Sequence, residues 1–362
     1  MKRVIKYSSI EQFNQVIRTV KERAAFMYFD EETQKAVFDP APNYPVVLAK
    51  VTEKIHGTNG SICFSNPDGF WVQSRTNIIT PESDNASCAS YAMKNKDEWL
   101  SIVNSLATEY NIDLDNNIIV MYFEWCGDGI QKKTALTGTS DKMAIIFSHF
   151  KVEPIDDVDE DDVGSVQSNW FETKVGDKWV SSPEANIFNI NDFPTYEFTI
   201  DFNKPLMVQN EMISLVKEVI EPASPVGKKF GFDANIGEGI VVTFIFKDRL
   251  YKFKVKGEAH TTSKVKTLNR VDDEKLQKIQ DIAQKVSPVW RLEQMFDLAI
   301  DALNGGKPDM TKMGDFIRLI SNDIIKEEID IIIDAGLEHK TIMPVVSTIA
   351  RQFFKEKCLE SE

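Results

Sequence analysis

Short apolar runs separated by turn residues dominate the first two thirds of the chain, and longer stretches with helical spacing follow them. The short runs predict buried strands and a hairpin, at 45–49, 61–65, 69–75, 118–127, 143–147, 240–242 and 251–257. The later stretches predict helices, at 271–286, 287–303, 311–335 and 340–357. This change of pattern predicts an α+β protein whose antiparallel-sheet domain is followed by a small all-helical domain.

We expect these two domains to cover residues 1–258 and 259–362. The boundary is predicted near Ala259, because the polar segment His260-Thr261-Thr262-Ser263 separates the last strand from the first helix. At the other end of the chain, Ser8-Ser9-Ile10-Glu11 has the pattern of a capping box. It predicts an amphipathic helix that runs to about Ala24, with short strands at 26–28 and 36–38.

Composition narrows the class of protein. The 362 residues carry a formal net charge of −14, which argues against a nonspecific nucleic-acid binder with a broad basic face. The charge is uneven, however, with an acidic run from Glu153 to Asp162 and a basic stretch from Lys247 to Arg270. The four cysteines form no CxxC pair, which argues against a zinc site or a disulfide framework. With no membrane span and no signal peptide apparent, we expect a cytoplasmic monomer, in the host cytoplasm if the protein is viral.

A lysine at the end of a predicted strand is the first candidate for chemistry. Lys54 follows the apolar run 45–49 and precedes Gly57. A strand holds such a lysine still and a glycine lets the backbone turn closely behind it, so the amine can be presented in a pocket. The alternative is a solvated lysine before an ordinary surface turn.

Two carboxylates lie in apolar strands. Glu124 interrupts the run 118–127, and a charge buried there must be paired or must bind a ligand; a neighbouring Arg or Lys is the alternative partner. Glu238 lies between two glycines, Gly237 and Gly239, which permit close approach of a ligand to the backbone.

A row of lysines is predicted on one face of the strand 251–257. Residues at a spacing of two share a strand face, so Lys252, Lys254 and Lys256 point the same way. If that face is enclosed, it needs an anion. If it is open, the lysines belong to an ordinary edge strand protected against pairing.

Taken in chain order, these fragments and a few others form one set: Lys54-x-His56-Gly57-x-Asn59, Arg75, Phe123-Glu124, Phe147, Glu238-Gly239-Ile240-Val241 and Lys254-x-Lys256. The set resembles the covalent nucleotidyltransferase superfamily of ligases and capping enzymes. Histidine two residues after the lysine is similar to the RNA ligase 2 branch of phage RNA ligases. Further likeness to that branch lies in three segments: Glu53 to Asn59, Gly129-Ile130-Gln131-Lys132 and Thr267 to Val271.

The resemblance implies an ATP-dependent RNA ligase that uses Mg²⁺, with Mn²⁺ as an alternative. A lysyl-AMP intermediate would form, AMP would pass to an RNA 5′-phosphate, and a 3′-OH would displace AMP to seal a nick in duplex RNA. Carried over by position, the catalytic residues would be Lys54 as nucleophile, Glu238 on metal or water, and Lys254 and Lys256 on the phosphate. The nucleotide would be bound by Phe147 on adenine, Glu124 and Arg75 on ribose, Asn59 on phosphate, His56 on the pyrophosphate or the lysine loop, and Glu53 through its backbone.

The chain departs from the family pattern at one place. Phe147 is usually followed by Asp, and here Ser148 and His149 follow it. No OB-fold pattern follows Lys256, as DNA ligases and capping enzymes would show, and this favours RNA over DNA as substrate. The alternatives are a ligase that prefers DNA or DNA/RNA hybrid nicks, and a non-catalytic RNA-binding protein on the same fold.

Overall fold

The structure is a computed structural model, and it describes residues 2–8, 10–131, 134–139, 141–156, 169–232, 236–257, 271–302 and 306–360. It divides into two compact units. The first consists of Met1–Ile17, Val47–Ile200 and Val208–Asn269, and the second of Arg18–Val46, Asp201–Met207 and Arg270–Glu362. The predicted boundary near Ala259 lies outside the described residues, as do most of the acidic run 153–162 and the segment 267–270.

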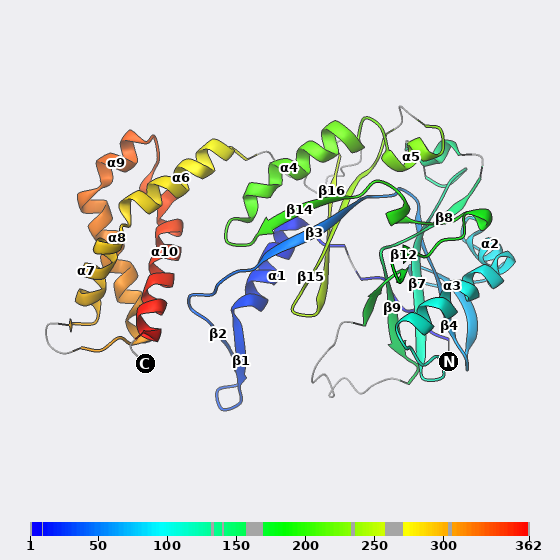
Figure 1. Cartoon of the computed structure of the whole chain (residues 1–362), viewed down its shortest axis with the longest axis horizontal. Helices are drawn as coiled ribbons and strands as arrows, with labels where there is room; N and C mark the ends of the chain where they lie inside the picture. The colour runs from blue at the N-terminus through cyan, green and yellow to red at the C-terminus, as the bar shows by residue number, and fades with distance from the viewer. Residues whose placement is uncertain are drawn as a thin grey trace. The chain divides into compact units, whose positions relative to one another are not determined.

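An eight-stranded sheet forms much of the first unit (Figure 1). Its strands are β4 (Thr58–Ser65), β5 (Gly69–Ser74), β6 (Ile78–Ile79), β7 (Asn117–Cys126), β8 (Met143–Ile146), β9 (His149–Pro154), β10 (Trp170–Glu172) and β13 (Ile187–Asn189). All pairs are antiparallel except β13 with β8. The central strand β7 is apolar on both faces because α3 (Lys96–Glu109) packs on one face and the N-terminal segment around Ile5 on the other.

A second sheet has four strands and contains those that lead to Lys54 and Glu238 and carry Lys254 and Lys256. Its order is β14 (Tyr196–Asp201), β3 (Val46–Glu53), β15 (Gly239–Phe246) and β16 (Arg249–Lys256). In the register of β15 with β16, Gly239 lies opposite Lys256 and Val241 opposite Lys254. Glu53, the last residue of β3, lies opposite Ile240. The sheet therefore brings the end of the Lys54 strand beside the start of the Glu238 strand.

The C-terminal helices share one apolar core, in which Phe316, Ile320 and Phe354 are fully buried (Figure 1). They are α6 (Asp273–Val286), α7 (Val289–Ala299), α8 (Met313–Glu327), α9 (Ile329–Asp334) and α10 (His339–Leu359). The prediction of an α+β protein, with antiparallel sheet first and helices last, is confirmed. No helix among the described residues is long and apolar enough to cross a bilayer.

The remaining elements are short or lie near the N-terminus. The helices are α1 (Phe13–Ala25), α2 (Cys88–Lys94), α4 (Gln209–Ser214) with its π-helical continuation η6 (Leu215–Ile220), and α5 (Pro225–Lys229). The 3₁₀ turns are η1 (Ala135–Gly138), η3 (Pro183–Ala185), η4 (Ile190–Asp192), η5 (Pro205–Val208) and η9 (Met310–Lys312). Two hairpins pair β1 (Phe26–Asp30) with β2 (Lys35–Phe38) and β11 (Lys174–Val175) with β12 (Lys178–Trp179).

Two predicted helix limits are wrong for identifiable reasons. The capping box at 8–11 does not begin α1, because Glu11 is bridged to β16 through the carbonyl of Lys252 and the N–H of Lys254, 3.1 and 3.2 Å away. The predicted helix 311–335 is two helices. They are separated at Glu328, whose φ of −126° is not helical and whose carboxylate accepts a hydrogen bond from Arg291.

Candidate functional site

The strand β3 delivers Lys54 into a tight turn. The N–H of Lys54 donates to the carbonyl of Gly239 at 2.8 Å, which fixes the backbone against β15. Three residues later, a Cβ on Gly57 would lie 2.3 Å from the carbonyl oxygen of Trp125. Only glycine allows the chain to pass so close to β7, so this turn is built as the sequence predicted.

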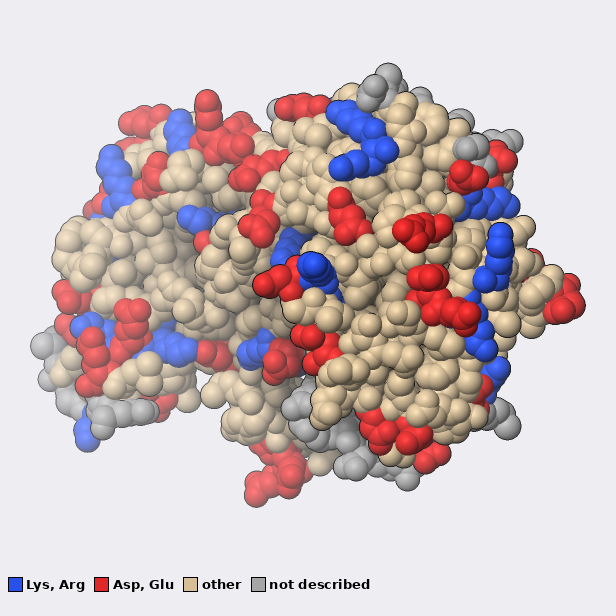
Figure 2. All heavy atoms as spheres, turned by 45° about the vertical axis from the view of Figure 1, so that its right-hand side comes forward, with Lys and Arg blue, Asp and Glu red and all other residues tan. Residues whose placement is uncertain are grey.

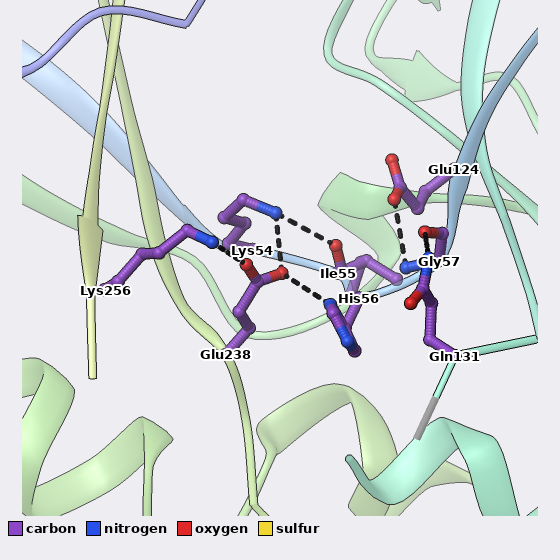
Figure 3. Close-up of polar contacts among 8 residues, drawn as sticks. All are labelled: Lys54, Ile55, His56, Gly57, Glu124, Gln131, Glu238 and Lys256. Carbon is purple, nitrogen blue, oxygen red and sulfur yellow. Dashed lines mark hydrogen bonds and ion pairs between the residues drawn. The ribbon is translucent and has the colours of Figure 1, made fainter. Parts of the chain in front are cut away.

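Glu238 is the centre of a cluster that contains two lysines and a histidine (Figure 3). Its Oε2 lies 2.6 Å from Nζ of Lys54 and 3.2 Å from Nδ1 of His56, and its Oε1 lies 2.6 Å from Nζ of Lys256. The side chain of Glu238 is only 2% exposed. Burial alone would raise the pKa of Glu238, but the hydrogen bond with His56 and the contacts with Lys54 and Lys256 outweigh burial and hold that pKa well below its usual value.

Glu124 holds the turn from the other sheet (Figure 3). Its Oε1 accepts a hydrogen bond from the N–H of Gly57 at 3.0 Å, and Nε2 of Gln131 donates to the carbonyl of Gly57 at 3.1 Å. Burial raises the pKa of Glu124 to about 7, although Lys54 and the bond from Gly57 act in the opposite direction. The carboxylate of Glu124 therefore has a hydrogen-bond partner in the backbone, the N–H of Gly57, and does not depend on an ion pair with a neighbouring Arg or Lys.

A cavity of about 60 Å³ opens beside Lys54 and is also lined by Glu53, Glu124 and Phe147. Glu53 is buried, and its carboxylate accepts hydrogen bonds from Oγ of Ser224 at 2.6 Å and the N–H of Val226 at 2.9 Å. Burial raises the pKa of Glu53 to about 7 against these bonds. The side chain of Glu53 thus anchors the start of α5.

The other predicted residues lie around the same cluster. Burial lowers the pKa of Lys254, and the charges of Lys256, Lys54 and Arg75 lower it further while Glu238 opposes them. Arg75 is exposed just after β5. Asn59 lies opposite Glu124 in the register of β4 with β7. The predicted residues from 53 to 256 are therefore assembled within one compact unit.

A family model for RNA ligase matches residues 49–256, more than half of the chain, and this range includes every predicted site residue. The chain belongs to the RNA ligase family. A search of the curated proteins found no match.

Solved structures of an RNA ligase from Naegleria gruberi are similar to the chain at low scores. With pyrophosphate, the identity is 12% and the TM-score 0.38, and for a mutant with ATP and Mn they are 13% and 0.38. In both cases the match covers 71% of this chain and 57% of the other. Such TM-scores are too low to add to the family assignment, which depends on the sequence match. The chain spans little more than half the length of these ligases.

The lysine face in this member of the RNA ligase family is enclosed, although β16 is the edge strand of its sheet. Lys252 is buried, Lys254 and Lys256 are partly buried, and Lys256 is paired with Glu238. The alternative of an open lysine face is therefore wrong. Figure 2 shows that the described Lys and Arg side chains on the face in view are interspersed with Asp and Glu and form no single broad patch. Basic residues gather locally instead, where Lys54, Lys254 and Lys256 lie around Glu238.

Sequence reasoning did not assign a role to Tyr7, His149 or Lys252, which also line the cavity. The sequence did contain a signal for Lys252, because its spacing of two residues from Lys254 places both side chains on the same face of β16. No local signal marks Tyr7, which comes from the N-terminal segment and contacts Phe147 with ring centroids 5.0 Å apart.

The carboxylate of Glu238 is the candidate ligand for a metal ion near Lys54. The described residues contain no group of three or more His, Cys, Asp or Glu side chains suited to a metal. Glu238 is the carboxylate nearest to Lys54, at 2.6 Å. Mg²⁺ is often held by one or two carboxylates, water and substrate phosphates, so Glu238 fits a metal ion that arrives with a nucleotide.

Proposed function

We propose that the chain is an ATP-dependent RNA ligase of the RNA ligase 2 type, which seals nicks in duplex RNA through a lysyl-AMP intermediate on Lys54. The observation that carries the proposal is the meeting of Lys54, His56 and Lys256 on the single buried carboxylate of Glu238. This cluster lies beside a cavity that Phe147 and Glu124 line. Family membership supports the same chemistry.

The first step would join AMP to the chain. Nζ of Lys54 would release its bond to Glu238, give a proton to water and attack the α-phosphorus of ATP; a P–N bond forms, the P–O bond to the β-phosphate breaks, and pyrophosphate leaves. Lys254 and Lys256 would face the charge that develops on the phosphate, where fixed cations lower the barrier. When bound, Mg²⁺ would neutralise phosphate charge, with Glu238 holding it. Phe147 would stack on adenine and Glu124 would accept from a ribose hydroxyl, with Arg75 near the ribose and Asn59 on the phosphate.

Two transfers would follow. An oxygen of an RNA 5′-phosphate attacks the phosphorus of lysyl-AMP, the P–N bond breaks and the amine of Lys54 regains a proton. The 3′-OH of the neighbouring strand then attacks the activated 5′-phosphate, loses its proton and displaces AMP as the phosphodiester bond forms. Each step replaces one bond to phosphorus by another, so no oxidant or reductant is needed.

The test is covalent labelling. Incubation with ATP labelled in the α-phosphate and Mg²⁺ should yield a labelled wild-type chain, and Lys54→Ala should abolish the label. Lys50→Ala is the matched control, because Lys50 lies on the same strand, is exposed and is paired with Glu172; its label should equal that of the wild type. Labelling of Lys54→Ala at the wild-type level would contradict the proposal.

Substrate preference needs a second assay. Matched nicked duplexes of RNA, DNA and mixed strands should be sealed fastest with RNA on both sides of the nick. Sealing should weaken as salt rises, because phosphate contacts release counterions. Faster sealing of DNA nicks would replace the proposal by a DNA-preferring ligase, and RNA binding without any label would indicate a non-catalytic protein on this fold.

A further inference from the structure

Lys252 is buried in the wall of the cavity, and the part of the chain that the structure describes gives it no hydrogen-bond partner. Only 6% of its surface is exposed, and among the described residues no atom accepts a hydrogen bond from its Nζ. The Nζ atom lies 3.7 Å from the ring centroid of Trp170 and 4.0 Å from that of Tyr7. The amine therefore lies against two aromatic rings, in a cavity that Phe147 and Val241 also line.

Packing alone does not account for a lysine at this place. Ring faces attract an ammonium group, but an amine carries donors that the rings leave unmatched, and burying a donor without an acceptor costs free energy. Burial, together with the charge of Lys151, lowers the pKa of Lys252. His149, on the same cavity, stays neutral because burial and the charges of Lys252 and Lys50 lower its pKa to about 3. Lys252 is thus a buried donor for which the described side chains and backbone supply no acceptor.

The position of Lys252 along β16 suggests what the acceptor is. Lys252 and Lys254 lie opposite Thr243 and Val241 in the register with β15, and Lys256 lies opposite Gly239, next to Glu238. The row of lysines therefore leads from the Glu238 cluster, where the proposed function needs phosphates, to the aromatic part of the cavity. A flat heterocycle between aromatic and apolar side chains offers lone pairs in its plane, and Phe147 and Val241 line the cavity there.

We propose that Lys252 recognises the nucleotide base by donating a hydrogen bond from Nζ to an unprotonated ring nitrogen of adenine. The proposal rests on the proposed function, because it names a specificity-determining residue for the same ATP site. Tyr7 and Trp170 position the amine. The base supplies the hydrogen-bond acceptor that the described residues do not provide. A base without a lone pair at that ring position loses this bond.

The experiment is a double-mutant cycle in which one change is made in the protein, at Lys252, and the other in the ligand, at a ring nitrogen of adenine. Wild type and Lys252→Met, which keeps an unbranched apolar side chain against the rings, are compared in the rate of lysine labelling with ATP and with 1-deaza-, 3-deaza- and 7-deaza-ATP. Loss of one hydrogen bond corresponds to a factor of about two to ten for an uncharged donor and up to about a hundred for a charged one. We expect wild type to lose this factor in kcat/KM with one analogue. Lys252→Met should lose it with ATP and lose nothing further with that same analogue.

Controls separate the possible failures. Lys174→Met is the matched variant, because Lys174 also lies over a tryptophan ring, that of Trp179 at 5.8 Å, but is paired with Asp177; it should behave as wild type with all nucleotides. Lys252→Leu takes the place of Lys252→Met if the latter does not fold, as judged by thermal unfolding. If the losses from Lys252→Met and from every analogue simply multiply, the inference is overturned while the ligase proposal stands. If wild type is never labelled by ATP, both are overturned.

Discussion

A buried ionic cluster is found among the described residues of each unit, and the two clusters differ in the sign of the central charge. In the first unit, the carboxylate of Glu238 is 2% exposed and contacts two lysines, Lys54 and Lys256, as well as His56. In the second, the guanidinium of Arg291 is 4% exposed and lies between Asp323 and Glu328. Arg291 also donates to the carbonyl of Val286 at 2.7 Å.

The difference between the clusters separates a binding role from a structural role. The hydrogen-bond and ion-pair partners of Arg291 lie in the helical core, at the end of α6 (Val286), on α8 (Asp323) and just after α8 (Glu328), so two carboxylates and a carbonyl surround one cation. The partners of Glu238 come from residues 54, 56 and 256, lie near a cavity, and have more positive than negative charge. A buried ion is therefore no sign of function by itself. An excess of one charge beside a cavity is such a sign, because it suits a ligand of the opposite charge.

The largest expected effect is on stability, at Arg291. Arg291→Met leaves Asp323 and Glu328 with an uncompensated charge, and breaking a buried pair in this way costs about 3–5 kcal/mol. Urea unfolding of the full chain measures this loss in the free energy of unfolding. Arg318→Met is the control, because its pair with Asp315 is exposed and should change the free energy of unfolding by less than about 1 kcal/mol. Equal effects of the two variants would show that the Arg291 cluster is not structural.

At Glu238 the expected effect is on chemistry. Glu238→Gln keeps the shape of the side chain but removes the charge that holds Lys54 and Lys256, so lysine labelling by ATP should slow by about 10²–10³-fold, as for the loss of one preorganised group in other active sites. Glu197→Gln, at an exposed position of β14 in the same sheet, should label at the wild-type rate. If Glu238→Gln unfolds in less urea yet labels normally, Glu238 belongs with Arg291 as a structural ion.

Glu124 should make stability depend on pH. Its pKa is raised from 4.5 to about 7, so the folded chain keeps a proton that the unfolded chain has lost, and stability falls as pH rises from about 4.5 to about 7. The full shift corresponds to about 3 kcal/mol. Glu53 has a similar pKa, and its effect cancels when wild type is compared with Glu124→Gln. We expect unfolding free energies of the two proteins to diverge between pH 5 and pH 7.5, and a constant difference would contradict the burial of this carboxylate.

Much of the fold follows from local pattern. The hairpin at Gly69 and the strand around Glu124 are found where period and turn residues predict them. The strand predicted at 45–49 is found at 46–53, but it is not buried throughout, because Val46 and Leu48 are exposed. Helix limits were less predictable, because long-range contacts decide them. Glu11 is extended by its bonds to β16, and Glu328 leaves the helical conformation where it meets Arg291.

The site was predictable only where residues form a pattern along the chain. The order Lys54, Glu124, Glu238 and Lys256 carries the resemblance to ligases, but the sequence does not state that Glu238 binds two of these lysines. Tyr7 could not be found, because the N-terminal segment reaches the cavity only through tertiary packing. Lys252 was visible as one of three lysines, and its burial against two rings depends on Trp170, which is 82 positions away along the sequence.

The smallest expected effect is at an exposed ion pair, which gives the baseline for both clusters. Lys50 and Glu172 lie 3.1 Å apart with 52% and 36% of their side chains exposed, and such pairs contribute about 0–1 kcal/mol. A double-mutant cycle with Lys50→Met and Glu172→Gln, measured by urea unfolding, should give a coupling in that range. The coupling should shrink further in 1 M salt, because the Debye length falls to about 3 Å. A coupling above about 2 kcal/mol that salt leaves unchanged would mean that burial is not what distinguishes Glu238 and Arg291 from the surface of this chain.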